Sequence, residues 1–165
     1  MKPIVLTRTS PAVPSRCTRL RSPARHSASF STQLTGDVTT TLVGEATFSQ
    51  IPGQRGARPV FGLALGPLSA QGAVFFRVMS GSRPGPGTYP ISCRGDGSDA
   101  VRATVVLGPV ERPFGEFQAR SGTLTIVSAS DARLVGTFSL ETTGLERSRE
   151  GLQLSLSGSF TARAV

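Results

Sequence analysis

Apolar side chains recur at every second position in three stretches of the chain: 42–48, 134–140 and 156–162. Thr, Ser, Gln, Glu or Arg mostly stand between them, which is the alternation of a strand that is buried on one face only. Each stretch begins Leu-x-Gly, so Gly44, Gly136 and Gly158 fall in the apolar phase. A glycine on the buried face leaves a gap that a neighbouring Phe can cover, and it lets the strand coil sharply. The repeated pattern therefore predicts a closed or strongly curved sheet.

The rest of the chain reads as short runs separated by turn residues, among them many of its 19 glycines and 12 prolines. The predicted strands are 38–49, 60–65, 73–79, 88–93, 101–107, 114–120, 123–128, 133–142 and 152–164. Their short connections favour an all-β fold, a single antiparallel meander of about eight or nine strands closed into a small barrel or a β-sandwich. No segment reads as a convincing helix.

Two local features refine this prediction. Ser121-Gly122 is expected to be a bend or bulge inside a longer strand, not a full stop. The last strand runs almost to the end of the chain, and the backbone N–H and C=O groups along its edge need a pairing partner. Pairing with the first predicted strand, 38–49, would cover this edge and close a barrel.

Residues 1–33 are rich in Ser, Pro, Ala and Arg and show no apolar periodicity. Such a segment buries too little surface to offset its ordering entropy, so we predict a disordered basic tail followed by a β domain over 34–165. The tail also has the composition of an organellar transit peptide, and translation could begin elsewhere. It has no recognisable secretory signal, because Ile4-Val5-Leu6 is far shorter than an h-region. It has no recognisable lipidation motif at Cys17, which Pro14-Ser15-Arg16 precede.

The net charge of +8 is concentrated in the tail. No acidic residue precedes Asp37, whereas six basic residues do, which leaves 12 of the 18 basic residues against all 10 carboxylates in the remainder. A nucleic-acid contact, if the protein makes one, is therefore expected through the tail and not through the β domain. There is also no apolar run near the roughly 18 residues of a transmembrane helix.

Candidate catalytic chemistry is sparse. The single histidine, His26, lies in the tail, so the β domain has no imidazole for nucleophilic catalysis or for a zinc site of the usual kind. Glu45 and Glu141 fall in the outward phase of their strands, and Asp96 and Asp99 suit a turn better than a calcium site, which needs 6–8 oxygens. We expect no catalytic, cofactor-binding or metal-binding residues and no enzymatic activity. Cys93 is expected to be a buried free thiol.

Seven phenylalanines could surround an interior ligand: Phe61, Phe75, Phe76, Phe114, Phe117, Phe138 and Phe160. An eight-stranded barrel is just wide enough to fill with side chains or to hold one small ligand. Inward glycines would enlarge such a space, whereas Phe packed over Gly would fill it. We favour a filled core and keep the ligand cavity as the alternative.

Several motifs carry a resemblance to known proteins: 42–48, Gly85-Pro-Gly-Thr-Tyr-Pro-Ile91, Ser121-Gly-Thr-Leu-Thr-Ile126, 135–140 and Ser157-Gly-Ser-Phe160. In these motifs and their order, residues 42–165 resemble a broad group of bacterial envelope β-domains of unknown function, many of them predicted lipoproteins. The resemblance implies an all-β fold and a place outside the cytoplasm, in the periplasm or at the cell surface. It assigns no catalytic residues.

These observations lead to one functional hypothesis with two alternatives. The first is an extracytoplasmic, non-enzymatic module that binds or scaffolds a component of the cell envelope. The second is a lipocalin-like carrier of a small apolar ligand in a barrel interior. The third is nucleic-acid contact through the basic tail.

Overall fold

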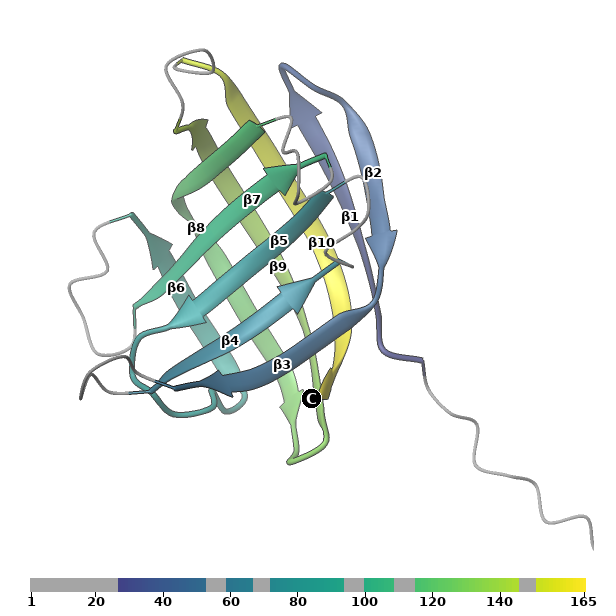
Figure 1. The fold of residues 1–165 in the computed structure, drawn as a ribbon, viewed down its shortest axis with the longest axis vertical. Helices are drawn as coiled ribbons and strands as arrows, with labels where there is room; N and C mark the ends of the chain where they lie inside the picture. The colour runs from purple at the N-terminus through teal and green to yellow at the C-terminus, as the bar shows by residue number, and fades with distance from the viewer. Residues whose placement is uncertain (1–26, 53–58, 67–71, 94–99, 109–114, 146–150) are drawn as a thin grey trace, which may run out of the picture.

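The computed structural model of the chain describes residues 27–52, 59–66, 72–93, 100–108, 115–145 and 151–165. These residues form ten strands and no helix (Figure 1). The strands are β1 (Ser29–Gly36), β2 (Thr40–Gly44), β3 (Ala46–Ile51), β4 (Val60–Leu65), β5 (Gly72–Val78), β6 (Gly87–Ser92), β7 (Val101–Leu107), β8 (Gly115–Ala129), β9 (Arg133–Gly144) and β10 (Gln153–Ala164). The all-β prediction is confirmed.

The ten strands form one sheet in which eight strands close into a ring, in the order β3, β4, β5, β7, β6, β8, β9 and β10. In Figure 1, β3, β4, β5 and β7 cross diagonally in front of β8, β9 and β10. The β1–β2 hairpin adds to the outside of this ring along β10. Most pairings are antiparallel, as predicted, but two short ones are parallel: β10 with β3 and β6 with β7.

The parallel pairing of β10 with β3 closes the ring. It involves only Arg163 with Thr47 and Ala164 with Phe48, because β1 already occupies the same edge of β10 over residues 154–161. The last strand therefore does pair with a part of the segment predicted as the first strand. The closure is a seam of two residue pairs and not a full-length antiparallel ladder.

The N-terminal part of the domain differs most from the prediction. The segment predicted as one strand, 38–49, is two strands, β2 and β3, separated at Glu45, whose carbonyl accepts a hydrogen bond from the Gly66 amide at 2.8 Å. The strand Ser29–Gly36 was not predicted at all, and its first five residues had been assigned to the tail. It buries only three side chains, those of Phe30, Thr32 and Leu34, among Ser, Thr and Gln. This is too little apolar signal to stand out in the sequence.

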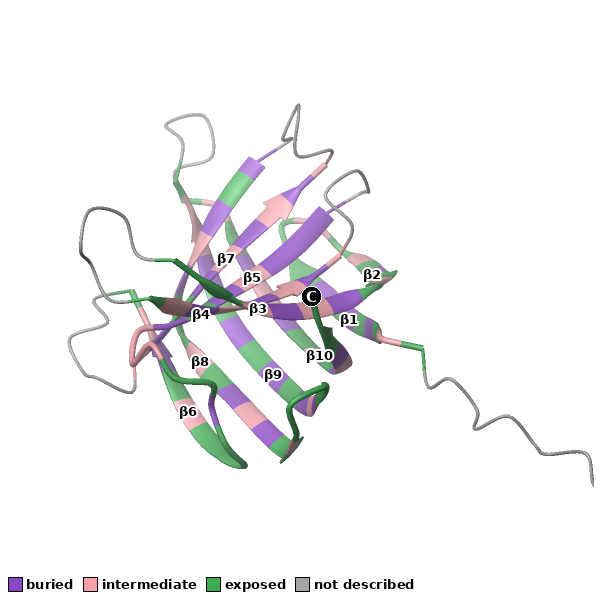
Figure 2. Cartoon of the chain, turned by 60° about the horizontal axis from the view of Figure 1, so that its bottom comes forward, coloured by how far each residue is buried: buried purple, intermediate pink, exposed green. Residues whose placement is uncertain are grey.

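The second and third repeated stretches are strands buried on one face, whereas the first is divided between β2 and β3. Figure 2 shows the alternation of buried and exposed residues along β9. Gly136 on β9 lies opposite Phe160 on β10, and Gly158 on β10 lies opposite Phe138 on β9. A Cβ atom added to Gly136 would stand 2.8 Å from Cζ of Phe160, and one added to Gly158 would stand 2.9 Å from Cζ of Phe138. The predicted packing of aromatic rings over missing side chains is therefore present, twice, in reciprocal positions.

The bulge predicted near Ser121-Gly122 is also present. The register between β8 and β9 shifts between Ala119 and Ser121. On the edge of β8 that does not pair with β9, the partner strand also changes at this point: residues 115–118 pair with β7, and residues 121–126 pair with β6. Gly122 has a φ of 147° and lies so close to the Ser139 carbonyl that a side chain would collide with it. The glycine lets the strand bend at the transfer from one partner to the next.

Candidate functional site

Five of the phenylalanines that could surround a ligand belong to the hydrophobic core. Phe61, Phe76, Phe117, Phe138 and Phe160 are all buried. The rings of Phe76 and Phe138 meet edge to face with centroids 5.3 Å apart, a favourable aromatic geometry. Phe75 is not part of this group, because it follows the outward phase of β5 and is half-buried on the outer face. Phe114 lies outside the described residues.

Two of the candidate catalytic residues, Glu45 and Glu141, lie within the described ranges, and each contacts a different partner. Glu45 is exposed and pairs with Arg163 at 3.5 Å, while Glu141 is exposed and accepts a hydrogen bond from Ser155 Oγ at 2.6 Å. Within the described ranges, no three His, Cys, Asp or Glu side chains gather as metal ligands would. His26, Cys17, Asp96 and Asp99 lie outside these ranges.

The prediction of a buried thiol at Cys93 is wrong, because this cysteine is exposed. Alternation from the buried Ile91 would place residue 93 inside the ring. β6, however, ends at Ser92, and Cys93 follows the end of the strand. A pattern of alternation predicts burial only as far as the strand continues.

The outer face of the sheet holds a feature that sequence reasoning missed. Two neighbouring rows of outward residues cross six paired strands, β2, β1, β10, β9, β8 and β6. One row is Val43, Ser31, Ser159, Thr137, Thr125 and Thr88, and the other is Thr41, Gln33, Ser157, Ser139, Thr123 and Pro90. We call these twelve residues the hydroxyl face. Nine of the twelve are Ser or Thr and none is ionisable.

The hydroxyl groups of this face lie close enough to interact across strands. Thr88 Oγ1 and Thr125 Oγ1 are 3.2 Å apart, and Thr123 Oγ1 and Ser139 Oγ are 3.3 Å apart. Each hydroxyl can donate one hydrogen bond and accept two, so the face retains donors and acceptors for a ligand. The charged residues of these strands stand beyond the two rows, as Glu141 and Arg163 do.

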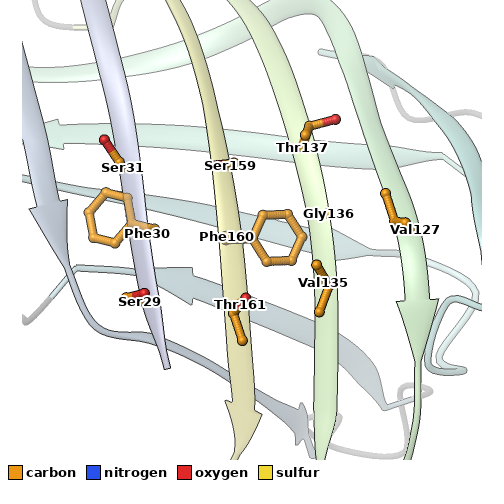
Figure 3. Close-up of a pocket in the computed structure, with 10 residues that line it drawn as sticks. All are labelled: Ser29, Phe30, Ser31, Val127, Val135, Gly136, Thr137, Ser159, Phe160 and Thr161. Carbon is orange, nitrogen blue, oxygen red and sulfur yellow. The ribbon is translucent and has the colours of Figure 1, made fainter. Parts of the chain in front are cut away.

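A groove of about 350 Å³ lies at one end of the hydroxyl face (Figure 3). Its lining combines five hydroxyl residues, two valines and the residues of the Phe-over-Gly packing: Ser29, Ser31, Thr137, Ser159, Thr161, Val127, Val135, Phe30, Gly136 and Phe160. Val127 is 64% exposed and gives the groove an accessible apolar side chain. None of the described residues that line the groove is ionisable, so the lining that they form is hydroxyl and apolar.

A second concavity, of about 230 Å³, lies at the seam where β10 meets β3. It is lined by Phe48, Ser49, Gln50, Phe61, Arg83, Ala164 and Val165. It differs from the groove in having a guanidinium group beside two aromatic rings.

The sequence contained the signal for the hydroxyl face, although only in the positions between the apolar ones. In 155–161, Ser155, Ser157, Ser159 and Thr161 occupy every outward position. Alternation alone shows only that these residues face outward, because their alignment across strands depends on register. The fold is needed to see that they form one uncharged surface.

The described part of the chain contains no helix long and apolar enough to cross a membrane. Comparison of the chain with protein-family models, with curated proteins and with solved structures finds no match in any of the three.

Proposed function

We propose that this protein is a non-enzymatic binding module of the cell envelope that holds an uncharged, hydroxyl-rich polymer, a glycan, on its hydroxyl face. The observation that carries the proposal is the groove, whose described lining has five hydroxyl groups and two valines and no ionisable side chain. The resemblance of residues 42–165 to bacterial envelope domains supports a place outside the cytoplasm.

The composition of the groove suits a neutral sugar polymer. Sugar hydroxyls can donate to and accept from Ser and Thr, and the less polar faces of a sugar ring can contact the exposed Val127 and the neighbouring Val135. A neutral ligand avoids the desolvation cost of bringing a charge to an uncharged surface.

Several weak contacts would have to act together. A hydrogen bond between neutral groups contributes only about 0.5–1.5 kcal/mol net, so a single sugar would bind poorly. The hydroxyl face extends the same chemistry over six strands, beyond the groove itself. A polymer that follows the rows would engage several positions at once, which is the geometry of a scaffolding module.

Affinity electrophoresis in native gels that contain hydroxyethyl cellulose or glycol chitin tests this proposal. We expect the wild-type protein to be retarded by at least one of these uncharged polysaccharides, and Thr137→Lys to lose the retardation because a long charged side chain enters the groove. The matched control is Thr104→Lys on the outer face of β7, away from the hydroxyl face. Equal retardation of Thr137→Lys and the wild type, or no retardation by either polymer, would contradict the proposal.

Salt distinguishes this function from nucleic-acid binding through the basic tail. Binding of an uncharged polymer should change little between about 50 and 200 mM salt, whereas contacts to several phosphates weaken steeply over that range. Retardation that collapses at higher salt would therefore argue against the hydroxyl face as the binding surface.

A further inference from the structure

Several connections meet at the end of the ring where β10 joins β3. The Val165 amide donates a hydrogen bond to the Phe48 carbonyl at 3.1 Å, and the Ala164 amide donates to the Ala132 carbonyl, in the turn between β8 and β9, at 3.2 Å. Gln50 Nε2 donates to the Gly81 carbonyl at 3.0 Å, which ties the end of β3 to the connection between β5 and β6. In Figure 2 this end comes forward, with the C-terminus beside β3. The concavity of about 230 Å³ lies among these segments, at one mouth of the barrel.

Two aromatic rings contribute the apolar part of this mouth. Phe48 and Phe61 have ring centroids 5.7 Å apart and planes inclined by 32°. Both are nearly fully buried in the structure, yet both line the concavity. An apolar group placed against their rings would lose part of its contact with water, which is the main source of favourable free energy for an apolar ligand.

Arg83 contributes the polar part. Its Nη1 donates to the Ser130 carbonyl at 2.7 Å, and its Nη2 donates to Asp131 Oδ1 at 2.8 Å. The arginine thus reaches from the connection between β5 and β6 to the turn between β8 and β9. The Ser130 carbonyl belongs to the backbone, so the Nη1 contact fixes the guanidinium in place.

The two contacts of Arg83 differ in how easily they can be exchanged. The Asp131 side chain is 102% exposed, whereas that of Arg83 is 34% exposed. An ion pair with a fully exposed carboxylate adds little to stability, because water screens it and two side chains must be held in one geometry. Asp131 can therefore turn into solvent and leave Nη2 to another carboxylate at little cost.

We propose that this mouth is a second binding site, which takes a small amphipathic anion such as a medium-chain carboxylate. The carboxylate replaces Asp131 at Nη2 of Arg83, since a guanidinium forms charge-assisted hydrogen bonds with carboxylates. The hydrocarbon end lies against Phe48 and Phe61. The volume is below the roughly 300–1,000 Å³ of pockets for drug-sized ligands, which limits the hydrocarbon part to a short chain. This site does not depend on the hydroxyl face or on the proposed function.

Titration of the ¹⁵N-labelled protein with octanoate, kept below its micellar concentration, tests the site. We expect saturable amide shifts at Phe48, Gln50, Arg83 and Val165, and at least tenfold weaker binding of 1-octanol, which lacks the charge. Arg83→Gln should weaken octanoate binding at least tenfold. The matched control is Arg77→Gln, which removes an exposed arginine on the outer face of β5 and should bind octanoate like the wild type.

A second variant makes the test independent of whether Arg83→Gln folds. Asp131→Asn removes the competing carboxylate and should tighten octanoate binding by a factor of two or more. Unchanged or weaker binding by Asp131→Asn would overturn the proposal, as would equal affinities for octanoate and 1-octanol or shifts centred on the groove residues.

Discussion

Replacement of Gly136 by Ala tests the packing on which the curved sheet depends. The added Cβ would stand 2.8 Å from Cζ and 3.1 Å from Cε1 of Phe160, and it would also collide with the Thr125 carbonyl oxygen. Phe160 is buried among other core side chains, which restrict how far its ring can move away from the added methyl group. We therefore expect Gly136→Ala to destabilise the protein.

The size of the effect follows from two opposing terms. In an ordinary strand position, Ala in place of Gly stabilises a protein by about 0.5–1 kcal/mol, because glycine loses more backbone entropy on folding. Extra atoms in a packed core typically cost about 1–3 kcal/mol, and here both a ring and a backbone carbonyl must give way, so the cost should lie near the upper end. The expected net loss is about 2 kcal/mol, which corresponds to a fall in Tm of about 4–8 °C for a chain of this size.

Thermal and urea denaturation, followed by circular dichroism, measure this loss in a double-mutant cycle. Phe160→Leu relieves the collision with the ring but not the one with the carbonyl, so Gly136→Ala/Phe160→Leu should cost at least about 0.5 kcal/mol less than the sum of the two single changes. The control cycle combines Gly136→Ala with Phe117→Leu. Phe117 lies opposite Gly144, eight residues from Gly136 along β9, or roughly 26 Å at the usual rise of a strand, so these effects should add.

Two results would refute the reasoning. One is a Gly136→Ala protein as stable as the wild type or more stable, which would mean that the glycine is an ordinary strand residue. The other is an additive cycle with Phe160→Leu, which would mean that the ring does not depend on the missing side chain.

Three further predictions follow from the described contacts. Thr142→Val removes a buried hydroxyl that donates to the Leu154 carbonyl at 3.1 Å, and it should lower the free energy of unfolding in urea by about 0.5–1.5 kcal/mol. The control Thr35→Val, at an exposed position, should change this free energy by less than about 0.5 kcal/mol. Equal effects of the two changes would count against the burial of Thr142. Because Cys93 is exposed, a single-cysteine variant that keeps it should react with a thiol reagent in the native state as fast as in the unfolded state, and protection until unfolding would contradict its placement. Deletion of residues 1–33 removes most of β1 with its buried Phe30 and Thr32, and it should lower the free energy of unfolding by more than about 3 kcal/mol. Deletion of 1–26 removes no described contact and should leave Tm nearly unchanged. Similar Tm values for the two deletions would show that β1 is not part of the folded domain.

The sequence was sufficient to predict most of the sheet, because alternation and turn residues determine strands locally. Val101–Leu107 was predicted with the bounds that the structure has, and the bulge after Ala119 was expected from Ser121-Gly122. Gly136 and Gly158 were predicted to lie under aromatic rings, and they do. The strand bounds and the bulge depend on residues within a few positions of one another, and each glycine lies opposite a ring on the strand next to it in the chain.

What the sequence did not reveal depends on pairing between distant segments. β1 has a weak apolar pattern and becomes a strand by adding to β10, more than 100 residues later in the chain. The break at Glu45 reflects two different partners, β1 for β2 and β4 for β3. The hydroxyl face and the mouth beside Arg83 combine residues from four or more strands or turns. No local pattern indicates such combinations, because register and closure are properties of the whole sheet.

Mapping the contact surface of an uncharged oligosaccharide by NMR tests the central claim most directly. Chitohexaose titrated into the ¹⁵N-labelled protein should shift the amides around Ser31, Thr137 and Ser159, where the groove lies. The amides near Phe48 and Arg83, at the mouth of the barrel, should not move. Shifts confined to that mouth, or the absence of any saturable shift on the hydroxyl face at millimolar sugar, would contradict the account.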